Sequence, residues 1–215
     1  MVIGAKYISS QMRKPTKGIW GFIARRRILK HNLHLEESTY RALAATPDQN
    51  ILELGFGLGY GLNIALKNIA TKGKGTVFGV DYSSDICNDA KKSFKNYISK
   101  GKLIILNEDV AQMSLHNNSI DGVFHTNCFY FWPDIIASLN EIQRVMKPGG
   151  VMVAGMNLGS LNKRVKDGLL QKWQIDPERY CSALEMSGFE DITQEDIYNE
   201  ILQKYLRIIK SSKPK

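Results

Sequence analysis

The sequence has few cysteines and no long apolar run, and both absences narrow the classes of protein it can represent. Its three cysteines, Cys87, Cys128 and Cys181, lie far apart in a chain of 215 residues. Their number and spacing fit neither a disulfide framework nor a metal site, so we expect reduced thiols, no bound metal and a cytoplasmic location. No apolar run approaches the roughly 20 residues of a membrane span, and the first residues lack the pattern of a signal peptide.

Acidic residues are missing from the first 34 positions. This stretch holds eight Lys and Arg residues, whereas the remainder holds 21 basic and 21 acidic residues and is neutral. The net charge of +8 is therefore a property of an N-terminal arm, residues 1–34. The length and the apolar content of 43% are ordinary for one globular domain, which we assign to residues 35–215.

Four interpretations of the basic arm stay open. It can be a solvated basic face, or a lid that closes over a bound ligand and brings Trp20 against the substrate. Its mixture of basic and apolar residues also suits contact with an anionic membrane surface. Binding to nucleic acid phosphates is the fourth, but the chain shows no RNA-binding signature elsewhere, so we do not expect nucleic acid as a partner.

The stretch from Asn50 to Leu62 organises the rest of the chain. The apolar run 51–54 predicts a buried strand, the glycines at alternate positions from 55 to 61 predict a tight turn, and a helical pattern follows. Strand, glycine turn and helix build a cofactor cradle in open α/β sheets, because glycine lets the backbone approach a ligand and the helix N-terminus offers free N–H groups. Neither the dinucleotide fingerprint nor a P-loop fits this spacing. Glu53 at the end of the strand suits a ligand with an ammonium group.

Further candidate residues follow the later strands. Asp81 ends a predicted strand over 76–80 and suits ribose hydroxyls, since a carboxylate accepts from both; the alternative is a turn or N-cap residue. Tyr82 beside it can stack on an adenine ring. A third strand is predicted over 103–106, and a helix is expected over 38–45, ahead of the glycine turn.

The segment 119–134 carries the residues closest to chemistry. Because strand ends line the ligand crevice in open α/β sheets, we expect Asn127 and the aromatic run Phe129–Trp132 to lie there. Phe129, Tyr130 and Trp132 then become substrate residues, although some of the run can instead fill core. His125 is a candidate general base, with a structural buried histidine as the alternative, and Tyr130 is a second catalytic candidate.

Taken in order, these motifs resemble those of class I S-adenosylmethionine-dependent methyltransferases of the small-molecule type. The resemblance rests on Glu53–Gly59, Asp81, Asp109, Asp121–Asn127 and Lys147–Gly150, each at the expected junction of strand and helix. It implies a Rossmann-like α/β fold with a seven-stranded, mostly parallel sheet, helices on both faces and an antiparallel last strand. It also implies S-adenosylmethionine as cofactor, held by Glu53, Gly55, Gly57, Gly59, Asp81, Tyr82, Asp109, Val110 and Asn127.

The methyl acceptor is less well defined by this resemblance. The chain is similar to the quinone-biosynthesis subgroup, yet it lacks that subgroup's N-terminal signature, so we expect only a small-molecule or lipid-like acceptor. The alternatives are a non-catalytic methyltransferase-like protein that docks on membrane or RNA through its arm, and a dehydrogenase-like nucleotide binder. After a helix over 177–187 we expect an antiparallel pair of strands, and a frayed tail over 210–215.

Overall fold

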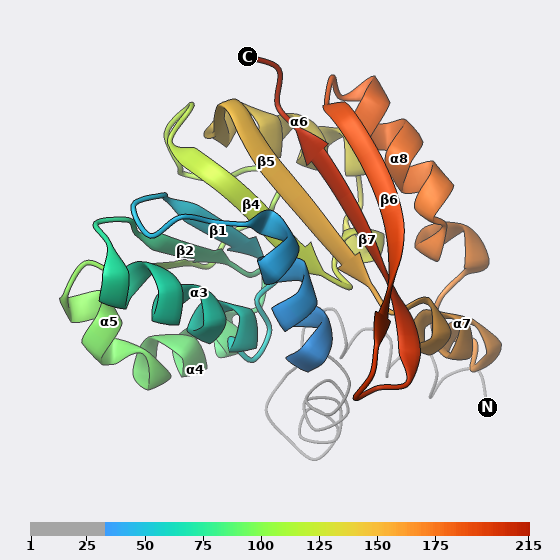
Figure 1. The fold of residues 1–215 in the computed structure, drawn as a ribbon, viewed down its shortest axis with the longest axis horizontal. Helices are drawn as coiled ribbons and strands as arrows, with labels where there is room; N and C mark the ends of the chain where they lie inside the picture. The colour runs from blue at the N-terminus through green and yellow to red at the C-terminus, as the bar shows by residue number, and fades with distance from the viewer. Residues whose placement is uncertain (1–32) are drawn as a thin grey trace.

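The computed structural model describes residues 33–215 (Figure 1). The predicted arm over residues 1–34 lies almost entirely outside the described residues, and Trp20 lies wholly outside them. The roles assigned to both stay predictions.

A seven-stranded sheet forms the centre of the molecule, in the order β3-β2-β1-β4-β5-β7-β6. Strands β1 to β5 pair in parallel, whereas β7 runs antiparallel to both of its neighbours, β5 and β6. The predicted sheet with its antiparallel last strand is therefore confirmed. The strands are β1 Ile51–Leu54, β2 Val77–Val80, β3 Leu103–Leu106, β4 Ile120–Thr126, β5 Met146–Met156, β6 Glu190–Asn199 and β7 Lys204–Ser212.

Helices cover both faces of the sheet (Figure 1). A helix over residues 33–43, together with α3 and α4, packs on one face, while α6 and α8 pack on the other. The labelled helices are α3 Tyr60–Lys72, α4 Ser84–Ser93, α5 Lys95–Ser99, α6 Ile135–Val145, α7 Leu158–Lys166 and α8 Pro177–Met186, with short 3-10 helices η1 Phe129–Phe131 and η2 Lys172–Ile175. Within residues 33–215 no helix has the length and apolar character needed to cross a membrane.

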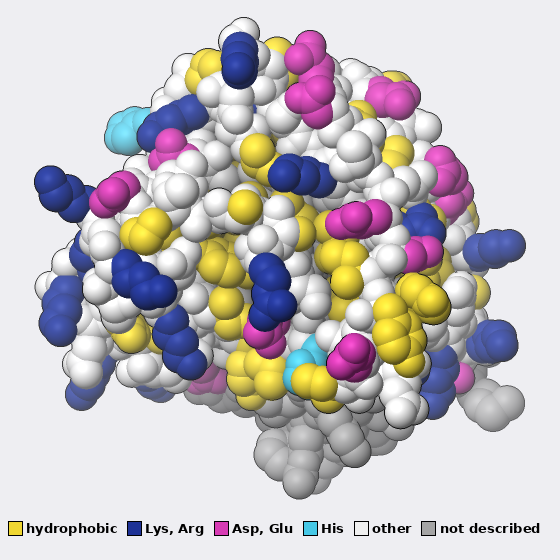
Figure 2. All heavy atoms as spheres, viewed as in Figure 1, with side chains coloured by type: hydrophobic (Ala, Val, Ile, Leu, Met, Phe, Trp, Pro, Cys, Tyr) yellow, Lys and Arg dark blue, Asp and Glu magenta, His cyan; other side chains and the backbone are white. Residues whose placement is uncertain are grey.

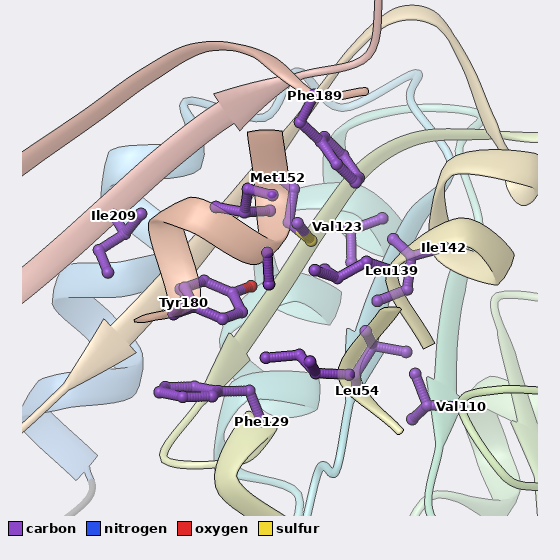
Figure 3. Packing of buried hydrophobic residues seen from close by; sticks show 14 of the residues in the cluster. Leu54, Val110, Val123, Phe129, Leu139, Ile142, Met152, Tyr180, Phe189 and Ile209 are labelled. Atoms are coloured by element: carbon purple, nitrogen blue, oxygen red, sulfur yellow. The ribbon is translucent and has the colours of Figure 1, made fainter. Parts of the chain in front are cut away.

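The short strand β1 shows why an unbroken apolar run is needed at the centre of such a sheet. Ile51 points into the layer of α3 and α4, whereas Leu52 and Leu54 point into the layer of α6 and α8. All four residues of β1 are buried, because helices cover both sides. On the α8 side, Figure 3 shows Tyr180 close to Phe129, and their rings stack at 4.3 Å between centroids.

Two sequence predictions about the ends of the domain need correction. The helix ahead of the glycine turn covers residues 33–43 rather than 38–45 within the described part. The tail over 210–215 does not fray: β7 continues to Ser212, and the Lys213 backbone N–H donates to the Gly150 carbonyl at 2.9 Å. The Lys213 ammonium group also donates to Asn118 Oδ1, Gln143 O and Met146 O at 2.7–2.8 Å, so its position depends on acceptors distant in sequence.

Charged side chains of both signs are interspersed on the face of the molecule drawn in Figure 2. This agrees with the equal numbers of basic and acidic residues, 21 of each, that follow the arm in the sequence. On this face, the described residues form a mixed surface rather than a basic stripe suited to phosphates.

Candidate functional site

A pocket opens at the carboxyl ends of β1, β2 and β4, where the strand order reverses between β1 and β4. Open α/β sheets bind ligands at this point, because neighbouring helices diverge there to opposite faces. The lining residues come from the glycine turn, the ends of β2, β3 and β4, the 3-10 helix η1, α7 and the helix 33–43.

The glycine turn needs glycine for two separate reasons. Gly55, Gly57 and Gly59 have φ values of 63°, 52° and 79°, in the left-handed region that L side chains rarely adopt. At Gly55 an added Cβ would also lie 2.5 Å from Cys128 Sγ, and at Gly59 it would lie 2.8 Å from the ring of Phe94. The turn can therefore bring backbone to the pocket, which Gly55 and Gly57 line and Gly59 does not.

Asp81 both lines the pocket and holds the glycine turn. Its carboxylate accepts the Gly57 N–H at 3.1 Å and the Ser83 N–H at 2.8 Å. Burial raises the pKa of Asp81 to about 6, although the hydrogen bonds from Ser83 and Gly57 oppose the rise. Asp81 therefore stabilises the turn, as one of the two interpretations of the sequence proposed, and it lines the pocket as well.

Four other predicted cofactor residues line the same pocket, namely Tyr82, Asp109, Val110 and Asn127. Tyr82 is half exposed, whereas Val110 is buried. Asn127 has a φ of 48°, and its backbone N–H donates to the Gly155 carbonyl at 3.0 Å, which fixes the end of β4. The fold therefore brings residues that follow three different strands to one crevice.

Glu53 lies beneath the glycine turn and is not among the lining residues. Its carboxylate packs against the Cα of Gly61 in the first turn of α3, where a Cβ would overlap with it. Burial raises the pKa of Glu53 well above its usual range; the nearby carboxylates of Glu36 and Asp81 raise it further, and the Leu62 N–H opposes them.

The predicted substrate and catalytic residues divide between pocket and core. Trp132 lines the pocket together with its neighbour Phe131, whereas Phe129 and Tyr130 are buried in the core. For Phe129 and Tyr130 the geometry supports the core-filling role that the sequence left open.

His125 also lies in the core and does not line the pocket. Its Nε2 is 2.8 Å from the Tyr180 hydroxyl, and burial lowers the pKa of His125 to about 3. This position supports the structural interpretation of His125 rather than the general-base one.

Sequence reasoning missed two charged lining residues, Glu36 and Arg164. Glu36 comes from the helix 33–43, and Arg164 comes from α7 in the segment after β5. Neither belongs to a motif, and a helical residue's position relative to a distant pocket has no local signal. Glu36 and Glu37 are neighbours in the sequence, and only the structure shows that Glu36 is buried whereas Glu37 is exposed.

The fold is Rossmann-like, and its pocket lies at the switch point of the sheet, where open α/β sheets bind ligands. Residues 52–154 match the family model described as a methyltransferase domain. This stretch is therefore similar to methyltransferase domains, and the fold of the whole sheet agrees with that similarity.

Similar proteins also carry the description of a methyltransferase. The chain is 27% identical over 161 residues to the uncharacterised methyltransferase YdaC of Bacillus subtilis, over 75% of this chain and 82% of that protein. It is 31% identical over 107 residues to an O-methyltransferase of Pyrenophora dematioidea, over 50% of this chain and 39% of that protein. The chain thus spans well under two thirds of the latter's length, and a smaller share of some other relatives.

Among solved structures, the chain is similar to phosphoethanolamine N-methyltransferase 2 of Haemonchus contortus in complex with S-adenosyl-L-methionine. The TM-score is 0.72 at 16% identity, over 97% of this chain and 60% of that one. At this identity the likeness shows the shared fold and does not define the acceptor.

Proposed function

We propose that this protein transfers a methyl group from S-adenosylmethionine to a small-molecule or lipid-like acceptor. The observation that carries the proposal is the convergence of the glycine turn, Asp81, Tyr82 and Asp109 at one pocket of a methyltransferase domain. The acceptor class goes beyond the comparisons and rests on the pocket itself.

The residues at the pocket fit this cofactor. Asp81 offers a buried carboxylate to ribose hydroxyls, and Tyr82 with Val110 offers an aromatic and an apolar surface to the adenine ring. Asp109 follows β3 and lines the pocket, and we assign to it the hydrogen bond from the adenine amino group. Glu53 leaves its Oε2 atom buried without a hydrogen-bonding partner, an acceptor suited to a cationic group.

Bound in this pocket, the cofactor supplies a methyl group already activated by a positively charged sulfur. What remains for the chain is to align the acceptor and to exclude water, and these effects can provide much of the rate enhancement. Phe131, Trp132, Pro133 and Arg164 line the pocket outside the cofactor set, and we assign the acceptor to them. Because His125 is outside the pocket, we expect no general base from it.

Cofactor binding is the first test. We expect Asp81→Asn to weaken S-adenosylmethionine binding at least about tenfold, a change of 1.4 kcal/mol, because the amide cannot accept from both ribose hydroxyls and the Gly57 N–H. Asp85→Asn, four residues along the chain in the first turn of α4, is the matched control and should leave the affinity unchanged. Saturable binding that survives Asp81→Asn unchanged would contradict the assignment of the pocket.

Label transfer is the test of the acceptor. Methyl-labelled S-adenosylmethionine is incubated with the protein and a cell extract, and the products are separated into lipid, aqueous small-molecule, protein and RNA fractions. Label in the lipid or aqueous fraction supports the proposal, with quinone precursors among the lipid candidates. Label in protein or RNA alone would overturn the acceptor class.

A further inference from the structure

Two buried carboxyl groups, Glu36 and Glu53, meet beside the glycine turn, although they come from different parts of the chain. Glu36 is only 6% exposed and Glu53 only 2% exposed. Glu36 interacts with the backbone N–H of Gly61 and Glu53 with that of Leu62, so both groups face the first turn of α3.

Each of these carboxyl groups leaves one oxygen without a partner. Oε2 of Glu36 and Oε2 of Glu53 are both buried and neither has a hydrogen bond. An unpaired buried carboxylate is costly, and two of them side by side are costlier, unless a proton or a cation is present. Glu36 also lines the pocket, so a ligand in the pocket can reach the pair.

The other charged groups around the pocket do not neutralise this pair. Asp81 and Asp109 add negative charge from the ends of β2 and β3, and Arg164 of α7 is the single cationic side chain among the described lining residues. No ion pair joins Arg164 to either glutamate within residues 33–215. The unpaired oxygens of the two glutamates therefore have no cationic partner among residues 33–215, and Glu36 is the member of the pair that lines the pocket.

We propose that Glu36 and Glu53 together bind the ammonium group in the amino-acid part of the cofactor, with Glu36 as the ligand-facing member of the pair. This inference rests on the proposed function and adds a cofactor-binding residue that precedes the methyltransferase-domain match at residues 52–154. An ammonium group has three donors, and two carboxylates on one side of it satisfy two of them.

If the two carboxyl groups share a site for a positive charge, binding of the cofactor's ammonium group displaces a proton from that site. Two adjacent buried carboxyl groups hold a proton between them when no cation is present. Burial raises the pKa of Glu36 to about 8, although the Gly61 N–H opposes the rise. When the ammonium group binds near neutral pH, that proton passes to solvent and both carboxylates become ionised.

The test compares two ligands on one pair of variants. S-adenosylhomocysteine carries the ammonium group, whereas 5′-deoxy-5′-methylthioadenosine has the same nucleoside and thioether without the amino-acid part. We expect Glu36→Gln to lower the affinity for S-adenosylhomocysteine at least about tenfold. The affinity for 5′-deoxy-5′-methylthioadenosine should change by less than about twofold. Glu37→Gln is the matched control, because Glu37 is the next residue on the same helix, is exposed and pairs with Arg41 at 3.0 Å.

The outcomes separate this inference from the proposed function. Equal loss for both ligands in Glu36→Gln, or no loss for either, would overturn the role of Glu36. If the wild-type protein binds neither ligand, the proposed function itself fails. The amide resembles the protonated carboxyl group in shape and in charge, so we expect Glu36→Gln to fold as well as the wild type.

A second measurement needs only the wild-type protein. Calorimetric titration at pH 7 in buffers of different ionisation enthalpy counts the protons released on binding. We expect release with S-adenosylhomocysteine and none with 5′-deoxy-5′-methylthioadenosine. Identical proton counts for the two ligands would contradict the exchange of ammonium for a proton.

Discussion

Tyr180 of α8 holds His125 of β4 through a hydrogen bond of 2.8 Å between its hydroxyl group and Nε2. Both side chains are completely buried, and Nδ1 of His125 has no partner. The bond joins a strand of the sheet to the helix that covers it. Because neither group lines the pocket, the pair is best explained as part of the core.

The first prediction concerns this pair. Tyr180→Phe leaves both nitrogens of His125 without partners in the core, and we expect the free energy of unfolding to fall by about 1–3 kcal/mol. Urea unfolding measures the loss, with Tyr198→Phe on exposed β6 as the control. S-adenosylhomocysteine affinity should change less than about twofold. If Tyr180→Phe kept normal stability but bound S-adenosylhomocysteine much more weakly, His125 would again be a candidate catalytic residue.

The second prediction concerns the second residue of two helices. A Cβ at Gly61 of α3 would overlap with the Glu53 carboxylate, whereas a Cβ at Gly159 of α7 would meet only Asn157 Oδ1 at 3.6 Å. We expect Gly61→Ala to lower the free energy of unfolding by about 1–3 kcal/mol and to weaken S-adenosylhomocysteine binding.

Gly159→Ala is the matched control for this change. Alanine is the better helix former, so it should raise stability by up to about 1 kcal/mol. Thermal unfolding of the two variants gives the comparison. Equal behaviour of Gly61→Ala and Gly159→Ala would show that the contact between Glu53 and α3 does not constrain the turn.

The third prediction is a pH dependence of stability. The pKa of Glu36 rises from its ordinary 4.5 to about 8 because of burial. Between these values the folded protein binds a proton that the unfolded chain does not, so the free energy of unfolding falls as pH rises through this range. Burial also moves the pKa of Asp81 to about 6 and lowers that of His125 to about 3, and these groups act mainly below pH 6.5.

Urea unfolding between pH 6.5 and 8.5 therefore measures mainly the contribution of the glutamate pair to the pH dependence of stability. We expect the ligand-free wild-type protein to be less stable at the upper pH, and Glu36→Gln to lose much of this slope. A wild-type slope that persists unchanged in Glu36→Gln would show that the proton is not held by Glu36.

The fourth prediction concerns the end of the last strand. The Lys213 ammonium group donates to three oxygens at 2.7–2.8 Å, two of them backbone carbonyls near α6. Lys213→Ala removes these charge-assisted bonds, and we expect a loss of stability of about 1–3 kcal/mol. Lys210→Ala, at an exposed position of β7, is the control. Chemical denaturation of both variants decides whether the end of β7 contributes to folding.

Much of the fold follows from local patterns in the chain. Short apolar runs predict strands because both faces of a parallel sheet are buried, and the glycine turn predicts the cofactor cradle because its backbone needs positive φ. These signals depend on neighbouring residues alone. They placed the pocket at the ends of β1, β2 and β4, together with Asp81, Tyr82, Asp109, Val110 and Asn127.

The local turn geometry and the packing of η1 on the core together decided which aromatic residues meet the pocket. Phe129, Tyr130 and Phe131 form one turn of 3-10 helix, in which successive side chains point about 120° apart, since there are 3.0 residues per turn. A run of four aromatics therefore cannot share one direction: two enter the core, and Phe131 and Trp132 turn to the pocket.

The sequence by itself determined the class of fold, the glycine turn and the line of polar residues at the strand ends, because each depends on contacts between near neighbours. Only the tertiary structure decided that Glu36 meets Glu53, that His125 meets Tyr180 and that Lys213 anchors the last strand. These contacts join residues 17 to 95 positions apart, and such pairs form only when helices and strands pack against one another.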